Sequence, residues 1–103
     1  MSEKELLLLD EEAKEEYKSF TKSEKEVFAS LLVIFDELGR APLQAERDAA
    51  ASVLEHRRMA TPLFSIEELA AIREAALKYV KKGFKPGAAE RKAFSEAVAE
   101  KKG

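Results

Sequence analysis

The fold of this 103-residue chain is decided by the stretch SEKEVFASLLVIFDELG, residues 23–39. Its large apolar residues recur at spacings of three and four, so an α-helix would gather them on one wide face. The residues on that face are Val27, Phe28, Leu31, Leu32, Ile34, Phe35 and Leu38. Val33 falls outside the face, and Gly39 stands where a glycine commonly ends a helix. We therefore predict that this segment is the central helix of the core.

Sequence motifs typical of helix N-termini occur on both sides of this segment. A Ser or Thr with a Glu three residues later can close a capping box. This spacing occurs at Ser2, Thr21, Ser23 and Ser65. Pro42 suits the first turn of a further helix, whereas Lys85-Pro86-Gly87 is typical of a turn. We predict helices over residues 2–20, 42–59 and 65–82, and a short one over 88–100. The second helix starts at Thr21 or Ser23 and ends at residue 38.

The amino-acid composition indicates the same fold class. Ala, Glu, Leu and Lys, all strong helix formers, supply more than half of the residues. Residues that favour strands are few and never alternate with polar ones over a long run. Hydrophobic residues make up 46%, enough for a core in a chain of this length. We predict an all-α fold, a compact bundle of four to five short helices with no sheet. It would be a single helical domain over residues 1–103, with the second and fourth helices at its core.

Several residue types are missing, and their absence excludes most catalytic and metal sites. The chain has no Cys and a single His, so it offers no disulfide and no thiolate nucleophile, nor a zinc site built on several Cys or His ligands. The four glycines do not form a phosphate-binding loop. Paired carboxylates such as Glu67-Glu68 fit solvated helix faces. We therefore expect no enzyme activity, no cofactor and no metal.

The N-terminal segment is unlike a targeting signal. Its four leucines, residues 6–9, are flanked by acidic side chains and lack the basic start and the length of a secretory signal. A membrane helix would need about 20 apolar residues. We therefore expect a cytoplasmic protein that does not enter membranes. The many charges and the scarcity of Asn, Gln and Cys are typical of thermophilic proteins, although a GC-rich genome explains the alanines equally well.

The leucine run is the first candidate for a binding surface. On the predicted first helix, Leu6 and Leu9 lie on the core face while Leu7 and Leu8 point elsewhere. Either this helix is tucked between others with Leu8 half exposed, or the leucines contact another protein or a second copy of the chain. Val33, on the far side of the central helix, adds to the second alternative. The candidate partner interface is therefore Leu7, Leu8 and Val33.

Two arginines, Arg57 and Arg73, lie on the apolar stripes of their predicted helices. An unpaired guanidinium is costly to bury, so each should have an acceptor. In one interpretation each forms an internal ion pair, with Glu46 or Asp36 as the partner, or extends its side chain so that the guanidinium reaches solvent. In the other the two arginines converge on a phosphate or carboxylate ligand.

The triplet His56-Arg57-Arg58 ends the predicted third helix. Cations at this end of a helix compensate the helix dipole, which is a structural role. The same residues could instead contact phosphate or nucleic acid, and His56 could in principle serve as a general base. Since no nucleophile or carboxylate constellation accompanies His56, we expect the structural role.

The last quarter of the chain is basic, although the whole chain carries a net charge of −2. Residues 78–103 have eight basic and three acidic side chains, and Lys81, Lys82 and Lys85 are among them. These lysines either only solubilise the surface or contact an anionic partner. Recognition of a DNA duplex by the fourth predicted helix is not expected, because the first turn of that helix is acidic.

These observations favour binding over catalysis. Our first hypothesis is a non-enzymatic protein-interaction module, a small adaptor, regulator or inhibitor. It would bind a larger partner through a helical surface and self-associate through its first helix. The alternative is an anion-binding protein that contacts nucleic acid or a phosphorylated small ligand. Its site would comprise Arg57, Arg58, Arg73, Lys81, Lys82 and Lys85.

Overall fold

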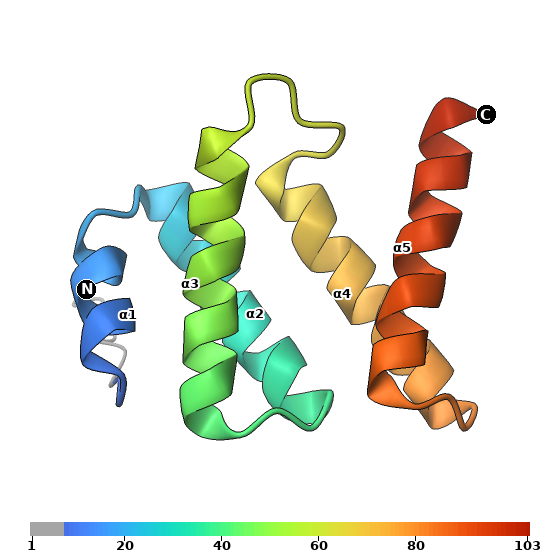
Figure 1. Ribbon diagram of the computed structural model, residues 1–103, viewed down its shortest axis with the longest axis horizontal. Coiled ribbons are helices and arrows are strands. Elements are labelled where there is room, and N and C mark those ends of the chain that lie inside the picture. The colour runs from blue at the N-terminus through green and yellow to red at the C-terminus, as the bar shows by residue number, and fades with distance from the viewer. Residues whose placement is uncertain (1–7) are drawn as a thin grey trace.

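The computed structural model describes residues 8–103, and within this range the chain forms five α-helices and no β-strand (Figure 1). The helices are α1 (Glu11–Lys18), α2 (Lys22–Glu37), α3 (Pro42–Arg58), α4 (Ile66–Lys81) and α5 (Pro86–Lys102). The all-α fold predicted from the sequence is therefore confirmed, as is the number of helices in the described range.

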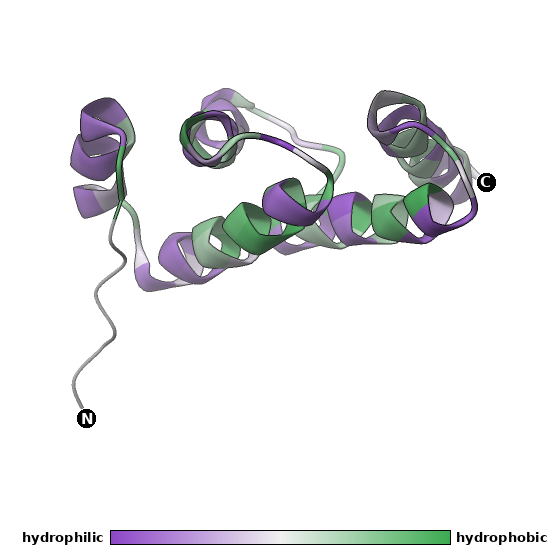
Figure 2. Cartoon of the chain, turned by 90° about the horizontal axis from the view of Figure 1, so that it is seen from below, coloured by the Kyte–Doolittle hydropathy of each residue, from purple (hydrophilic) through white to green (hydrophobic). Residues whose placement is uncertain are grey.

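The helices lie in two layers (Figure 2). One layer holds α2 and α4, and the other holds α1, α3 and α5. α2 packs against both α3 and α4, α4 packs against α5, and α1 packs against α3. α2 and α4 are thus the central helices, as predicted, while α1 and α5 form the two edges of the bundle.

The hydrophobic core is centred on α2. Phe28, Leu31 and Phe35 of this helix, together with Val53 of α3, are the largest side chains that are fully buried. α3 contributes mainly small residues to the same core, namely Ala45, Ala49 and Ala50. Small side chains let two helices approach closely, so the large residues of α2 fill most of the space between the layers.

Two of the predicted capping boxes are present. At the start of α2, the backbone N–H of Glu24 donates to the Thr21 hydroxyl at 3.2 Å, and the Thr21 N–H donates to Oε1 of Glu24 at 2.8 Å. Ser65 and Glu68 form the same pair of bonds at the start of α4. These bonds satisfy backbone donors that the first turn of a helix leaves free. Thr21, rather than Ser23, is therefore the N-cap of α2.

The first helix begins later than predicted. Leu8 and Leu9 are not helical, and Asp10 is the N-cap of α1, where its carboxylate accepts the N–H of Ala13 at 2.9 Å. The reason lies on another helix: Oε1 of Glu46 in α3 accepts the N–H groups of both Leu9 and Asp10 at 2.8 Å. The predicted capping pair of Ser2 and Glu5 lies outside the described residues.

The last helix is longer than predicted. α5 starts at Pro86, so the Lys85-Pro86-Gly87 segment is the beginning of a helix and not a free turn. Proline is well suited to the first helical position, because it has no N–H to leave unsatisfied there. The tight turn lies just before it, at Gly83, whose φ of +106° ends α4 in the left-handed region that glycine adopts freely.

Candidate functional site

The predicted interface of Leu7, Leu8 and Val33 does not form one surface. Leu8 is only 7% exposed and belongs to the hydrophobic core, so its side chain is not available to a partner. Val33 is 59% exposed on the outer side of α2, as expected. Leu7 lies outside the described residues. The expectation for Leu8 is corrected, because Leu8 precedes α1 in a non-helical segment that Glu46 binds through the N–H of Leu9, and does not lie on an outer helix face.

Arg57 forms an ion pair with a carboxylate of the same chain, as the first of the two interpretations expected. Its Nε and Nη2 atoms donate to the two carboxylate oxygens of Glu24 at 2.8 and 2.6 Å, and Nη2 also donates to the Ser19 carbonyl at 2.8 Å. The hydrogen bond from Arg57 is the main reason why the pKa of Glu24 falls to about 2. This pair fastens the end of α3 to the start of α2.

The partners predicted for the arginines were wrong. Glu46 binds backbone N–H groups instead of a guanidinium, and Asp36 is exposed. Hydrophobic periodicity shows which face of a helix a residue occupies, but it cannot show which residue from a distant segment lies opposite.

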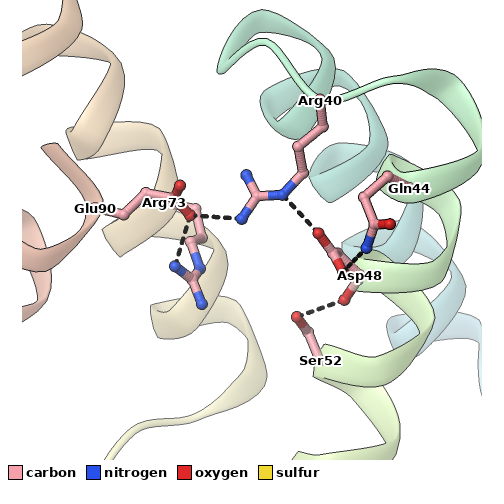
Figure 3. Close-up of polar contacts among 6 residues, drawn as sticks. All are labelled: Arg40, Gln44, Asp48, Ser52, Arg73 and Glu90. Carbon is pink, nitrogen blue, oxygen red and sulfur yellow. Dashed lines mark hydrogen bonds and ion pairs between the residues drawn. The ribbon is translucent and has the colours of Figure 1, made fainter. Parts of the chain in front are cut away.

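Arg73 belongs to a polar network that joins four segments (Figure 3). Nη1 of Arg73 and Nη2 of Arg40 donate to the same oxygen, Oε1 of Glu90, at 2.7 and 3.0 Å. Arg40 also donates through Nε to Asp48 at 2.6 Å, and its guanidinium lies 4.1 Å from the centre of the Phe35 ring. Burial acts to lower the pKa of Arg40, but the hydrogen bonds to Glu90 and Asp48 raise it overall. The network therefore favours the charged form of Arg40.

His56 and Arg58 have separate surroundings. Nε2 of His56 donates to the carbonyl of Phe64 at 3.0 Å and thereby ties the loop between α3 and α4 to α3. Arg58 is exposed and lines a hollow of about 260 Å³ between α1 and α3. The same hollow is lined by the carboxylates of Asp10, Glu12, Glu16 and Glu55 and by Arg47, which pairs with Asp10. The carboxylates outnumber the arginines there, which disfavours an anionic ligand. Arg57 and Arg73 are engaged with other carboxylates, so the three arginines do not form one anion site.

Lys81, Lys82 and Lys85 are brought together at the turn between α4 and α5, and all three are exposed. This turn and the end of α3, which carries Arg57 and Arg58, lie at opposite ends of the bundle (Figure 1). The residues of the predicted anion site are therefore distributed over separate places.

Sequence reasoning missed a groove between α4 and α5. It has a volume of about 480 Å³ and opens to the surface. Its apolar walls come from Phe64, Ala71, Ile72, Ala75, Tyr79, Ala93 and Ala97, and its polar edge from Glu68, Glu96, Glu100 and Lys101. The one sequence feature that points to the groove is a pair of alanines four residues apart on each helix, Ala71 and Ala75 on α4 and Ala93 and Ala97 on α5. Such pairs are common in any alanine-rich helix, so they do not predict a groove by themselves.

The edge of the groove is partly neutralised. Nζ of Lys101 lies 2.8 Å from Oε2 of Glu68, and this hydrogen bond is the main reason why the pKa of Glu68 is lowered. The Tyr79 hydroxyl donates to Glu96, which raises the pKa of Tyr79. Glu100 has no ion pair with any residue in the described part of the chain. The three lining carboxylates outnumber the one lining ammonium, so this edge is acidic, although Lys82 and Lys92 lie 5.5 Å from the centre of the Tyr79 ring at the other end of the groove.

The comparisons with known proteins do not assign a family. The chain matches no protein-family model, and no curated protein or solved structure is significantly similar to it. Within residues 8–103, no group of three or more His, Cys, Asp or Glu side chains is arranged to hold a metal ion, and no helix is both long and apolar enough to cross a membrane.

Proposed function

We propose that this protein is a non-enzymatic protein-interaction module whose α4–α5 groove binds an amphipathic, basic helix of a larger partner protein. The observation that carries the proposal is the groove itself, an open channel of about 480 Å³ with apolar walls and an acidic edge. Amphipathic helices commonly bind by laying their apolar face in such a groove. The cytoplasmic location expected from the sequence is part of this proposal.

The dimensions of the groove support a helical occupant. Its α4 wall runs from Glu68 to Tyr79, which at 1.5 Å per residue is about 16 Å, or three turns of a bound helix. Alanines on both walls allow the apolar side chains of a partner to approach the backbone closely. Phe64 closes one end, where its ring packs edge-on against Phe94 at 5.8 Å.

Charge supports a basic occupant. Glu68 and Glu96 are engaged with Lys101 and Tyr79, but each keeps lone pairs that a partner cation can reach at the surface. Glu100 is free to pair with an incoming Lys or Arg. Such complementarity favours basic partners over acidic ones and speeds their association.

The test uses two labelled helical peptides with the same apolar face, one flanked by lysines and the other by glutamates. Binding is followed by fluorescence anisotropy and mapped by amide chemical-shift changes. Ala71→Trp fills the groove from its exposed α4 wall, and Ala99→Trp places the same bulk on α5 outside the lining residues. We expect the lysine peptide to bind with shifts along α4 and α5, and Ala71→Trp to weaken it about tenfold while Ala99→Trp does not.

Three results would contradict the proposal. The glutamate peptide could bind as well as the lysine peptide, the shifts could map to another surface, or Ala71→Trp could leave the affinity unchanged. Self-association through the first helix stays a separate prediction, to be checked by light scattering, since the groove does not require it.

A further inference from the structure

The turn between α4 and α5 carries a second charged surface, at the end of the bundle where these helices are joined (Figure 1). The three lysines predicted from the sequence, Lys81, Lys82 and Lys85, are joined here by three more cations. These come from the two helices that meet at the turn, Lys78 from the end of α4 and Arg91 and Lys92 from the first half of α5. We call this surface the basic turn, and it consists of Lys78, Lys81, Lys82, Lys85, Arg91 and Lys92. All six side chains are exposed.

The protein does not neutralise the basic turn. Within residues 8–103, none of the six cations has a carboxylate at ion-pair distance. The only acidic residue in the sequence from 75 to 95 is Glu90, and Glu90 is engaged with Arg40 and Arg73. Four arginines elsewhere in the fold do have carboxylate partners, namely Arg40, Arg47, Arg57 and Arg73. Lys78 and Lys81 stand in the last turn of α4, where cations compensate the helix dipole. The same dipole argument disfavours a cation at Lys85, the N-cap of α5, and like charges around one turn repel one another, so folding alone does not explain the cluster.

Aromatic surface lies within the same patch. The rings of Tyr79 and Phe84 meet edge-to-face at 5.4 Å, and Phe84 is 40% exposed. The ammonium of Lys82 lies 5.5 Å from the centre of the Tyr79 ring, and that of Lys92 lies 5.9 Å from the centre of the Phe84 ring. An exposed ring among lysines combines stacking with phosphate contacts, as proteins that bind single-stranded nucleic acids do.

We propose that the basic turn binds single-stranded nucleic acid, with Phe84 stacking on a base and the lysines around it contacting phosphates. A duplex would hide its base faces from Phe84. A lipid surface fits less well, because membrane-binding helices bury a wide apolar face and Phe84 is the one large apolar side chain that is exposed within the basic turn. The six cations and Phe84 lie outside the lining of the α4–α5 groove, and the two sites share only Tyr79, which lines the groove and contacts Phe84.

The first experiment measures fluorescence anisotropy of labelled 12-nucleotide RNA and DNA of mixed sequence. If three or four phosphates are contacted, the affinity should fall about 20- to 50-fold between about 50 and 200 mM salt. The charge test is Lys81→Glu/Lys85→Glu. Its matched control, Lys14→Glu/Lys22→Glu, makes the same change in net charge at two exposed lysines of α1 and α2. We expect the first pair to weaken binding at least tenfold and the control pair to change it less than twofold.

The second experiment tests the ring. Phe84→Ala should weaken binding about fivefold or more, in keeping with the loss of one stacked base. Phe94→Ala is the matched control, since Phe94 is 41% exposed but lies outside the basic turn. Circular dichroism confirms that each variant is folded. Loss of binding in Lys81→Glu/Lys85→Glu and Phe84→Ala, with both controls unchanged, supports the proposal.

Other outcomes would overturn it. These are no binding at 50 mM salt, equal losses in the test and control variants, an affinity that does not respond to salt, or preference for a duplex of the same sequence. Binding to vesicles that contain phosphatidylserine, without binding to either oligonucleotide, would assign the basic turn to lipid instead. Ala71→Trp is included throughout. It should leave nucleic-acid binding unchanged, so failure of the groove proposal and failure of this one are distinguishable.

Discussion

Arg73 of α4 and Glu90 of α5 form an ion pair at 2.7 Å across the contact between these helices (Figure 3). The same oxygen of Glu90 accepts a hydrogen bond from Arg40, which follows α2. One carboxylate therefore serves two guanidinium groups, and only 11% of its side chain is exposed. Because α5 otherwise contacts the bundle mainly through α4, this carboxylate links the edge helix to the rest of the fold.

The first prediction concerns removal of that carboxylate charge. Glu90→Gln keeps the shape of the side chain but leaves Arg40 and Arg73 close together with no shared counter-charge. Breaking a buried pair costs about 3–5 kcal/mol, and the partial exposure of the two arginines reduces this to roughly 2–3 kcal/mol. Urea unfolding would measure the loss, with the exposed Glu26→Gln as control. Equal stability of the two variants would show that the network contributes little.

The second prediction is a loss of stability in acid. The pKa of Glu24 is about 2 in the folded protein against an ordinary value of 4.5. The folded state thus binds the Glu24 proton less readily than the unfolded state does, and stability that is fully present above pH 4.5 is lost as the pH falls toward 2. Asp10 and Glu68 also have lowered pKa values and add to the acid sensitivity.

Arg57→Gln isolates the Glu24 contribution, because the hydrogen bond from Arg57 is the largest cause of the shift. Melting temperatures measured by circular dichroism from pH 6 to pH 2.5 should fall less steeply for Arg57→Gln than for the unchanged protein. The two curves should converge at the acidic end. Parallel curves over the whole range would contradict the assignment of this pair.

The third prediction compares two neighbouring leucines. Leu8 is 7% exposed and Leu9 is 67% exposed. Leu8→Glu would bury a carboxylate in the core, so it should cost roughly 3 kcal/mol or more and unfold much of the protein at 37 °C. Leu9→Glu should change stability by less than about 0.5 kcal/mol. If Leu8→Glu instead remained stable and only altered the size measured by light scattering, Leu8 would be an interface residue after all.

Features that depend on residues close together in the sequence were predicted correctly. The apolar face of α2 follows from spacing within the helix itself, and the capping boxes at Thr21 and Ser65 involve residues three apart. The polar contacts could not be predicted in the same way. Arg57 and Glu24 are separated by 33 residues, and Arg40 and Glu90 by 50. Only the packing of the helices decides which of the many charged side chains meet.

The error in the first helix has a similar cause. A run of four leucines with strong helix propensity favours a helix through residues 8–10, but a distant carboxylate on α3, Glu46, accepts the backbone N–H groups at Leu9 and Asp10. Tertiary contacts of this kind override propensity. The groove escaped prediction for a different reason, since it depends on the space left between α4 and α5 and not on the residues of either helix alone.

The fourth prediction uses two glycines of the α4–α5 turn, whose roles the sequence did not separate. Gly83 has φ of +106°, a backbone conformation that strains any other residue. Gly87, in contrast, lies in the first turn of α5, and a Cβ added there would meet only Nη1 of Arg91, at 3.5 Å. Gly83→Ala should therefore destabilise the protein by about 1–2 kcal/mol. Gly87→Ala should stabilise it by about 0.5–1 kcal/mol, because alanine lowers the entropy of the unfolded chain and favours the helix. Urea unfolding of the two variants measures both effects, and a loss of stability in Gly87→Ala would mean that α5 does not begin at Pro86.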